Sequence, residues 1–300
     1  MKNMKSKKPK LIVILGPTAV GKSELGVKLA KRFNGEIVSA DSRQVYKGMD
    51  IGTGKVTKKE MQGVPHYLLD VASPKRRFTV AQYQKLAFKA IDKILKKGKL
   101  PFLVGGSPFY IYSVVDGYVF PKIPPNRKLR EKLERKSEKE LFEILKKLDP
   151  ERAETIDKKN KRRLIRAIEI AKKLGKVPPL KKNPRYDCLL LGIKKPKEVL
   201  TKLIKKRLEK RLKRGMIAEV KRLRKEGVSF KRLEEFGLEY RWIAWFLQGK
   251  IEKKEMIEGL QKDIEKFAKR QMVWFKRDKR IHWIKNQREA EKLIKEFLKK

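Results

Sequence analysis

LIVILGPTAVGKS, residues 11–23, is the stretch that decides the fold of this chain. Its first five residues, Leu11–Leu15, are apolar and are predicted to form a buried β-strand. The residues after them fit the pattern G-x-x-x-x-G-K-[ST], which joins a strand to a helix in phosphate-binding loops. Glycines in the pattern let the backbone curl and turn successive N–H groups inward. The stretch therefore predicts an α/β fold with a phosphate cradle at the edge of its sheet.

Two polar side chains complete the predicted phosphate site. Lys22 can reach terminal phosphate oxygens, and the Ser23 hydroxyl can ligate Mg²⁺. The helix that begins there adds the positive end of its dipole. An ordinary strand–turn–helix with chance glycines is the alternative, but strand, loop and helix occur in the order that the motif demands. The residues predicted to hold a diphosphate are Gly16, Pro17, Thr18, Ala19, Val20, Gly21, Lys22 and Ser23.

The composition is typical of a globular protein with one large domain or two smaller ones. The chain has 300 residues, of which 40% are hydrophobic, and no segment is predicted to be a signal peptide or a membrane span. The single cysteine, Cys188, excludes a disulfide within the chain and fits a reducing cytoplasm. With only His66 and His282 beside it, a Cys/His zinc site is not expected.

The formal net charge of +46 is extreme. One interpretation is a polyanionic partner, most naturally a nucleic acid. The other is a lysine-rich composition that reflects genome bias or a high growth temperature. Because the lysines are spread over the whole chain and do not form one stripe, the charge alone leaves both interpretations open.

A second predicted strand, Glu36–Ala40, ends at Asp41. Chemistry in parallel α/β sheets gathers at the carboxyl ends of the strands, so Asp41 is expected beside the phosphate loop. Its carboxylate can act there as a base or a metal partner, and the alternative is a helix or turn cap. The next segment, 45–74, is rich in glycine and is interpreted as an active-site loop over the sheet edge.

A third predicted strand, Leu100–Val104, ends in Gly105-Gly106-Ser107. Nucleotide hydrolases with a loop of this type usually carry an aspartate at such a strand end, where it helps to hold Mg²⁺. The glycines at this place argue against a nucleotide hydrolase.

The middle of the chain, Arg127–Leu174, is predicted to be wholly helical and comes after the proline-rich break Pro121–Pro125. We interpret it as a helical domain, residues 122–185, inserted into an α/β core made of residues 1–121 and 186–300. Within it, Arg162, Arg163 and Arg166 lie within about one helical turn and could grip phosphates or bases. The alternative is a solvated basic face.

The remaining segments return to the core. A buried strand is predicted at Asp187–Ile193 and one long helix at Lys197–Glu226. The aromatic-rich stretch Phe230–Phe246 is interpreted mainly as core packing, with base stacking as the secondary interpretation. A helix over Lys253–Phe275 and a short strand at Ile281–Ile284 precede a charged C-terminal helix.

Seven stretches, taken in order, resemble the tRNA dimethylallyltransferase family, which is also called the tRNA isopentenyltransferase family. A phosphate loop alone is shared by many families, whereas DSRQVYKGMDIGTGK together with a later AKRQMVWF is far more specific. The resemblance covers nearly the whole chain. The stretches are GPTAVGKS (16–23), SADSRQVYKGMDIGTGK (39–55), VPHYLLD (64–70), PFLVGGSPFYI (101–111), RRLIRAIE (162–169), RLEKRLKRGMIAEVKRL (207–223) and AKRQMVWFKRDKRIHW (268–283).

The resemblance implies a reaction and a fold. The family transfers a dimethylallyl group from dimethylallyl diphosphate to N6 of an adenine adjacent to the anticodon, at tRNA position 37, and releases diphosphate. It implies a P-loop NTPase-like parallel sheet with an inserted all-helical tRNA-binding domain, Mg²⁺ as cofactor, and a cytoplasmic monomer. The use of the loop for a leaving diphosphate also accounts for the missing strand-end aspartate.

Roles for individual residues are implied by the same resemblance. Asp41 would be the general base on the adenine amine, and Ser107 would share the site. Lys22, Arg207, the loop amides and Mg²⁺ would stabilise the departing diphosphate, with Ser23 as the metal ligand. The adenine must be flipped out of its stack to reach the allylic carbon. The residues implied to contact tRNA are Asp41, Ser42, Arg43, Gln44, Ser107, Arg130, Arg162, Arg163, Leu164, Ile165 and Arg166.

Three places depart from the usual family pattern. Ser107-Pro108 stands for the usual Thr-Gly, so a hydroxyl is kept but its position can shift. Pro65-His66-Tyr67 stands for Pro-His-His, and 237–240 reads Gly-Leu-Glu-Tyr instead of Gly-Tyr-Lys-Glu. These changes concern loop details and not the reaction.

Two other classes of function remain to be compared with a prenyltransferase. A small-molecule kinase would use Asp41 to deprotonate a hydroxyl and ATP as donor, but a basic helical insertion would then be unexplained. A non-catalytic RNA-binding protein would have no need of Asp41, Lys22 and Ser107. The sequence does not reveal which tRNAs are modified, how long a prenyl donor is accepted, or whether a nucleotide also binds the loop.

Overall fold

The computed structural model describes residues 8–300, which divide into two compact units. One unit joins the segment up to Gly117 with Pro184–Lys300, and the other is Tyr118–Asn183. The insertion predicted from the sequence is 122–185. Each unit has its own hydrophobic core.

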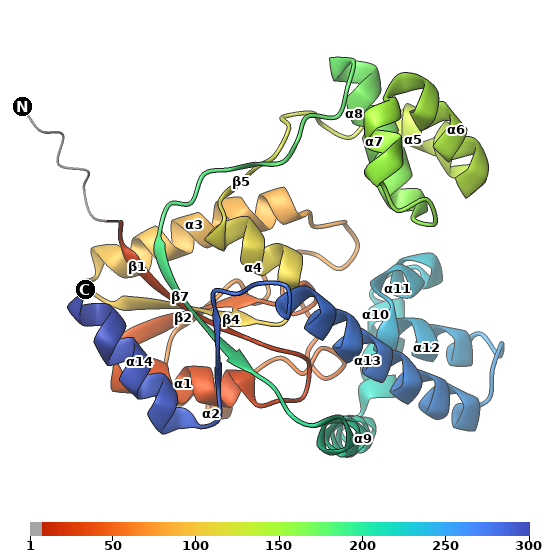
Figure 1. Ribbon diagram of the computed structural model, residues 1–300. Helices are drawn as coiled ribbons and strands as arrows, with labels where there is room; N and C mark the ends of the chain where they lie inside the picture. Colours follow the sequence, from red (N-terminus) through yellow and green to blue (C-terminus); the bar gives the residue numbers. More distant parts are fainter. Residues whose placement is uncertain (1–7) are drawn as a thin grey trace, which may run out of the picture. The chain divides into compact units, whose positions relative to one another are not determined.

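The first unit is built on a six-stranded sheet in the order β3-β2-β4-β1-β7-β8, and every neighbouring pair is parallel (Figure 1). This confirms the predicted α/β fold with a parallel sheet. Parallel strands buried on both faces read as continuous apolar runs, which makes β1 and β4 recognisable in the sequence. The strands are β1 (Lys10–Leu15), β2 (Gly35–Ala40), β3 (His66–Tyr67), β4 (Leu100–Gly105), β7 (Asp187–Ile193) and β8 (Ile281–Ile284).

Helices cover both faces of this sheet (Figure 1). Helix α1 (Lys22–Arg32) and helix α14 (Gln287–Lys299) share one core with the strands, in which Val27, Leu29 and Ile294 are buried. The other face carries α3 (Val80–Lys96) and α4 (Pro108–Val115), which pack against each other. The short helix α2 (Lys58–Met61) lies within the segment predicted to be an active-site loop.

Five helices connect β7 to β8 and pack against one another. The single helix predicted over 197–226 is wrong, because the chain turns at Gly215, which has a left-handed φ of +92° and begins a new helix. The aromatic-rich stretch is divided in the same way at Gly237. The helices are α9 (Lys197–Lys213), α10 (Met216–Lys225), α11 (Phe230–Phe236), α12 (Leu238–Leu247) and α13 (Lys253–Phe275).

The second unit is helical apart from one short antiparallel pair, β5 (Tyr118–Val119) with β6 (Lys181–Lys182). Its core is formed by leucine, isoleucine and alanine side chains, among them Leu141, Leu145 and Leu164. Its helices are α5 (Arg127–Glu134), α6 (Glu138–Leu148), α7 (Pro150–Thr155) and α8 (Lys161–Leu174). Across residues 8–300, no helix combines the length and the apolar character that crossing a membrane requires.

Candidate active site

Three strand ends meet level with one another at the carboxyl edge of the sheet. Gly105 at the end of β4 pairs with Leu15 at the end of β1 and with Ala40 at the end of β2. The phosphate loop, Asp41 and Ser107 each begin within one or two residues of these ends. The strand register therefore brings together the predicted site residues from three separate parts of the sequence, as expected for a parallel sheet.

In the loop 16–23, the side chain of Lys22 folds back so that its ammonium group binds the backbone of the same loop. Lys22 Nζ donates to the carbonyl oxygen of Pro17 at 2.5 Å, while Ser23 lies at the start of α1. Desolvation, and after it the positive charge of Arg207, lowers the pKa of Lys22 to about 7, against an opposing effect of Asp41. These shifts indicate that Arg207 and Asp41 act on the lysine electrostatically. The cradle is thus short of negative charge, which an anionic ligand would supply.

A buried glutamine that the sequence analysis does not identify ties the loop to β4. Gln271 of α13, 3% exposed, accepts from the amide of Thr18 at 2.9 Å and donates to the carbonyl oxygen of Gly106 at 2.6 Å. A Cβ added at Gly106 would lie 2.6 Å from Gln271 Nε2 and 3.3 Å from the carbonyl oxygen of Gly16. A side chain at this strand end, where a nucleotide hydrolase carries its aspartate, would therefore have to displace the end of the Gln271 side chain.

Arg207 of α9 reaches the same loop. Its Nη1 donates to Thr18 Oγ1 at 3.3 Å. Burial and the neighbouring charge of Arg211 lower the pKa of Arg207 to about 10, so it stays protonated at neutral pH. The cradle therefore combines its own basic side chain, Lys22, with the guanidinium of Arg207 from another element.

Asp41 forms a turn that is fastened to the end of β4. Its Oδ1 accepts from the amides of Arg43 at 2.8 Å and Gln44 at 3.3 Å, so the turn cap considered from the sequence is present. Ser107 Oγ accepts from the amide of Ser42 at 2.9 Å. Asp41 also acts electrostatically on Lys22 and on Arg207. The cap and a chemical role are therefore compatible.

The two side chains after Ser42 have protein partners. Arg43 Nε donates to the carbonyl oxygen of Phe236 at 2.9 Å, and its guanidinium lies over the Phe236 ring. Gln44 Nε2 donates to the carbonyl oxygen of Gly54 at 3.2 Å. Contact of these two side chains with RNA stays a prediction.

Two of the arginines predicted to contact tRNA surround one buried carboxylate in the second unit. Glu169, 3% exposed, accepts from Arg130 at 3.0 and 2.7 Å and pairs with Arg166. Leu164 and Ile165 are 0% and 6% exposed and pack in the core of this unit. The prediction of tRNA contact therefore rests on the arginines and not on the two apolar side chains.

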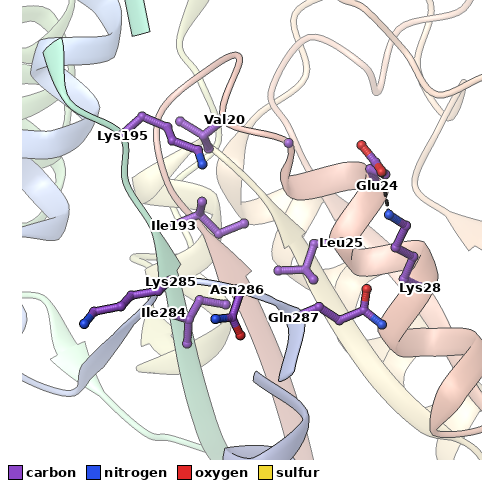
Figure 2. A pocket seen from close by; sticks show the side chains of 11 residues that line it. Val20, Glu24, Leu25, Lys28, Ile193, Lys195, Ile284, Lys285, Asn286 and Gln287 are labelled. Atoms are coloured by element: carbon purple, nitrogen blue, oxygen red, sulfur yellow. Dashed lines mark hydrogen bonds and ion pairs between the residues drawn. The ribbon is translucent and has the colours of Figure 1, made fainter. Parts of the chain in front are cut away.

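A pocket of about 220 Å³ opens beside the cradle (Figure 2). Val20, Leu25, Ile193 and Ile284 give it an apolar lining, and lysines stand around it. Asp41 does not line it. The pocket is therefore formed by the cradle residues Val20 and Gly21 and by the carboxyl ends of β7 and β8, and the Asp41 turn does not contribute to it.

Three buried polar residues share a signal by which the sequence could reveal them. Gln271, Glu169 and Glu219 each lie on the apolar stripe of a helix, where neighbours three or four residues away are buried. A polar side chain at such a position must find a hydrogen-bond partner inside the protein. The pattern predicts a buried polar contact, although it does not identify the partner.

Comparisons with known proteins agree with the resemblance seen in the sequence. The profile of the IPP transferase family matches residues 44–278. The chain is 42% identical to the tRNA dimethylallyltransferase of Carboxydothermus hydrogenoformans over 299 residues, which cover 96% of this chain and 95% of the relative. It is also 42% identical to tRNA dimethylallyltransferase 1 of Geotalea uraniireducens over 293 residues, which cover 96% of this chain and 97% of the relative.

Solved structures similar to this chain are also transferases of this kind. The full-length tRNA isopentenylpyrophosphate transferase of Bacillus halodurans superposes with a TM-score of 0.73 at 36% identity, over 97% of this chain and 96% of that one. A eukaryotic dimethylallyltransferase acting on tRNA gives a TM-score of 0.77 at 30% identity, over 89% of this chain and 69% of that one. The phosphate cradle, the Asp41 turn and these matches lead to one conclusion: the chain belongs to the IPP transferase family.

Proposed function

We propose that this protein transfers the dimethylallyl group of dimethylallyl diphosphate to N6 of the adenine adjacent to the anticodon of tRNA. The relatives that match nearly the whole chain are named for dimethylallyl transfer to tRNA. The observation that carries the proposal is that the cradle and Asp41 share one sheet edge, where Asp41 acts electrostatically on both Lys22 and Arg207.

In this reaction, the bond between the allylic carbon and the diphosphate oxygen breaks, and a carbon–nitrogen bond to N6 forms. The amine loses a proton, which Asp41 accepts as general base because an exocyclic amine is a poor nucleophile. The negative charge that develops on the leaving diphosphate is stabilised by Lys22, Arg207 and the loop amides. Ser107, bonded to the Asp41 turn, holds that turn against the end of β4.

Mg²⁺ fits this site through one protein oxygen. The described residues contain no group of three His, Cys, Asp or Glu side chains able to hold a metal. Mg²⁺ needs no such group, because it commonly keeps several waters and binds phosphates together with one or two protein oxygens. The hydroxyl of Ser23, at the N-terminus of α1, is the ligand that we propose. The ion would supply positive charge to the diphosphate.

The proposed site of action is the cytoplasm, and the proposed state is a monomer. The tRNA would be held in part by Arg130, Arg162, Arg163 and Arg166 of the helical unit, while Asp41–Gln44 and Ser107 would meet the flipped adenine. The high positive charge of the chain suits this polyanionic substrate.

One incubation tests the proposal. The protein is mixed with labelled dimethylallyl diphosphate, ATP and bulk tRNA. Label in tRNA supports prenyl transfer. Turnover of ATP without labelled RNA would instead indicate a kinase, and retention of tRNA without either reaction would indicate a binding protein. Nucleoside analysis of the labelled tRNA then identifies the modified base.

Binding of a diphosphate is expected to depend on pH through Lys22. Its pKa of about 7 in the free protein means that it loses its proton as the pH rises above 7, and an anion in the cradle favours the protonated form. Well below pH 7, the lysine is already charged and takes up nothing. Above pH 7, binding of inorganic diphosphate should take up as much as one proton. Calorimetry at pH 8.5 in buffers of different ionisation enthalpy measures the net uptake, and the difference between the wild type and Lys22→Met, which should approach one proton, is the contribution of Lys22.

Arg162→Gln is expected to weaken tRNA binding in a salt-dependent manner. Loss of one phosphate contact lowers the slope of log affinity against log salt concentration by roughly 0.7–0.9. Filter binding at several salt concentrations measures the slope. Lys31→Gln is the matched control, because this exposed lysine lies in the last turn of α1, away from the sheet edge that carries the site. Equal slopes in the wild type and Arg162→Gln would mean that Arg162 contacts no phosphate and lies on an ordinary solvated face.

A further inference from the structure

A buried carboxylate holds the loop that comes after the Asp41 turn. Glu219 of α10, 5% exposed, accepts hydrogen bonds from three consecutive amides of this loop. Its Oε2 accepts from Asp50 at 2.8 Å and Ile51 at 2.6 Å, and its Oε1 accepts from Gly52 at 3.0 Å. The hydroxyl of Tyr240 donates to Oε1 at 2.8 Å. Four neutral donors thus converge on a single side chain.

The amides of this loop depend on Glu219. Among the residues that the structure describes, no lysine or arginine forms a salt bridge with its carboxylate, and the four neutral donors satisfy it instead. A buried N–H group that loses its acceptor is costly, because it has already left water. The loop conformation over Asp50–Gly52 therefore requires an acceptor at this position.

The loop so fixed lies against functional residues. The carbonyl oxygen of Gly52 accepts from Arg211 at 3.1 Å, and that of Gly54 accepts from Gln44 at 3.2 Å. A Cβ added at Gly54 would collide with the guanidinium groups of both Arg211 and Arg207. The loop therefore packs directly on Arg207, whose Nη1 in turn donates to Thr18 of the cradle.

We propose that Glu219 is a positioning residue for the transfer reaction. It fixes the loop 50–54, and the loop fixes two groups in turn: the guanidinium of Arg207 at the cradle and the amide of Gln44 beside Asp41. This inference rests on the proposed function, because it assigns Glu219 to the geometry of that reaction. We assign Glu219 no contact with either substrate. It acts through residues that lie 167 to 169 positions earlier in the sequence.

Glu219→Gln is the first test. The glutamine side chain keeps one acceptor oxygen but turns an NH₂ group toward the loop, so some of the backbone N–H groups of Asp50–Gly52 lose their acceptor. We expect kcat to fall about 10- to 100-fold, since a displacement of about 1 Å in a catalytic group can cost that much. The KM for tRNA should change little, because the arginines of the helical unit are unaffected.

Glu36→Gln is the matched control. Glu36 is 1% exposed and also accepts from a tyrosine hydroxyl, Tyr67, but it lies near the amino end of β2 and pairs with Lys97 and Lys99. The same chemical change there should lower the thermal unfolding temperature and leave kcat unchanged. A structural role alone for Glu219 would give this same result.

Gly54→Ala provides a second, independent test. The added methyl group would press on the guanidinium groups of Arg211 and Arg207, and the left-handed φ of +59° at this position adds backbone strain to the loop. It should reproduce the loss of kcat, and the double variant should lose less than the product of the two single effects, because both act through one loop. If Glu219→Gln does not fold, Tyr240→Phe takes its place, because it removes one of the four donors to Glu219 without adding an atom beside Arg207, and it should also lower kcat.

The outcomes separate the two proposals. If the wild type puts no label into tRNA, the proposed function fails. If the wild type labels tRNA, and both Glu219→Gln and Gly54→Ala label it at the wild-type rate, the positioning role is overturned. A reduced kcat in both variants, with Glu36→Gln unchanged, supports it.

Discussion

Asp41→Asn is expected to lower kcat by on the order of 10²- to 10⁴-fold, which is the usual contribution of a general base. The asparagine oxygen can still accept from the amides of Arg43 and Gln44, so the turn that the aspartate caps in the structure is kept. What is lost is the ability to take a proton from the adenine amine. Single-turnover measurements with bound tRNA and labelled dimethylallyl diphosphate report this step directly.

Two further variants separate chemistry from structure at this position. Asp41→Ala removes both the base and the cap, so it should lose the same rate and some stability in addition. Asp70→Asn is the control, because this exposed aspartate binds Lys55, which keeps Asp50 as a second partner. The assignment of Asp41 fails if Asp41→Asn keeps its single-turnover rate, or if it loses tRNA binding while the rate with bound substrate holds.

Lys22→Met is expected to lower kcat/KM for dimethylallyl diphosphate by on the order of 10²- to 10³-fold, as removal of one donor to a developing anion does in other enzymes. Methionine keeps much of the side-chain length but has no charge and no N–H donor. Arg207 remains as a second cation, so the loss should be large without being complete. Steady-state kinetics with saturating tRNA measure the change.

Lys31→Met is the matched control for this variant, because it removes the same charge from the far end of α1. It should leave kcat/KM unchanged. An equal effect of both substitutions would mean that Lys22 acts only through the overall charge of the protein. The Lys22→Met variant should also remove the contribution of Lys22 to proton uptake when diphosphate binds above pH 7. The loss of kcat/KM and the loss of proton uptake can therefore be compared in one protein.

Local patterns predict the elements that carry the chemistry. The apolar runs of β1, β4 and β7 are short and continuous, and the glycine-rich motif predicts the loop and the helix after β1. The helix Lys253–Phe275 is predicted with its observed ends, because its apolar residues recur at helical spacing. Since parallel strands share one carboxyl edge, the meeting of Asp41, Ser107 and the cradle is a consequence of these predictions.

Contacts between distant parts of the sequence are not predictable in this way. Gln271 binds Thr18, which lies 253 residues earlier, and Glu219 binds amides that lie 167 to 169 residues earlier. A helical pattern shows that such a residue faces inward but not what it meets. The break at Gly215 is not predictable from the local pattern either. A glycine inside a helix costs only about 1 kcal/mol, so one glycine in a long periodic segment does not by itself indicate a turn.

The glycine pair at the end of β4 also limits how this protein could evolve. A carboxylate at position 106 would have to displace the end of the Gln271 side chain, which binds Thr18 of the cradle and the carbonyl oxygen of Gly106. An acidic group of the kind that phosphate-loop hydrolases use could therefore be gained here only by disturbing the contact between Gln271 and the cradle. The packing that supports the diphosphate cradle thus opposes the acquisition of a hydrolytic carboxylate at the same strand end.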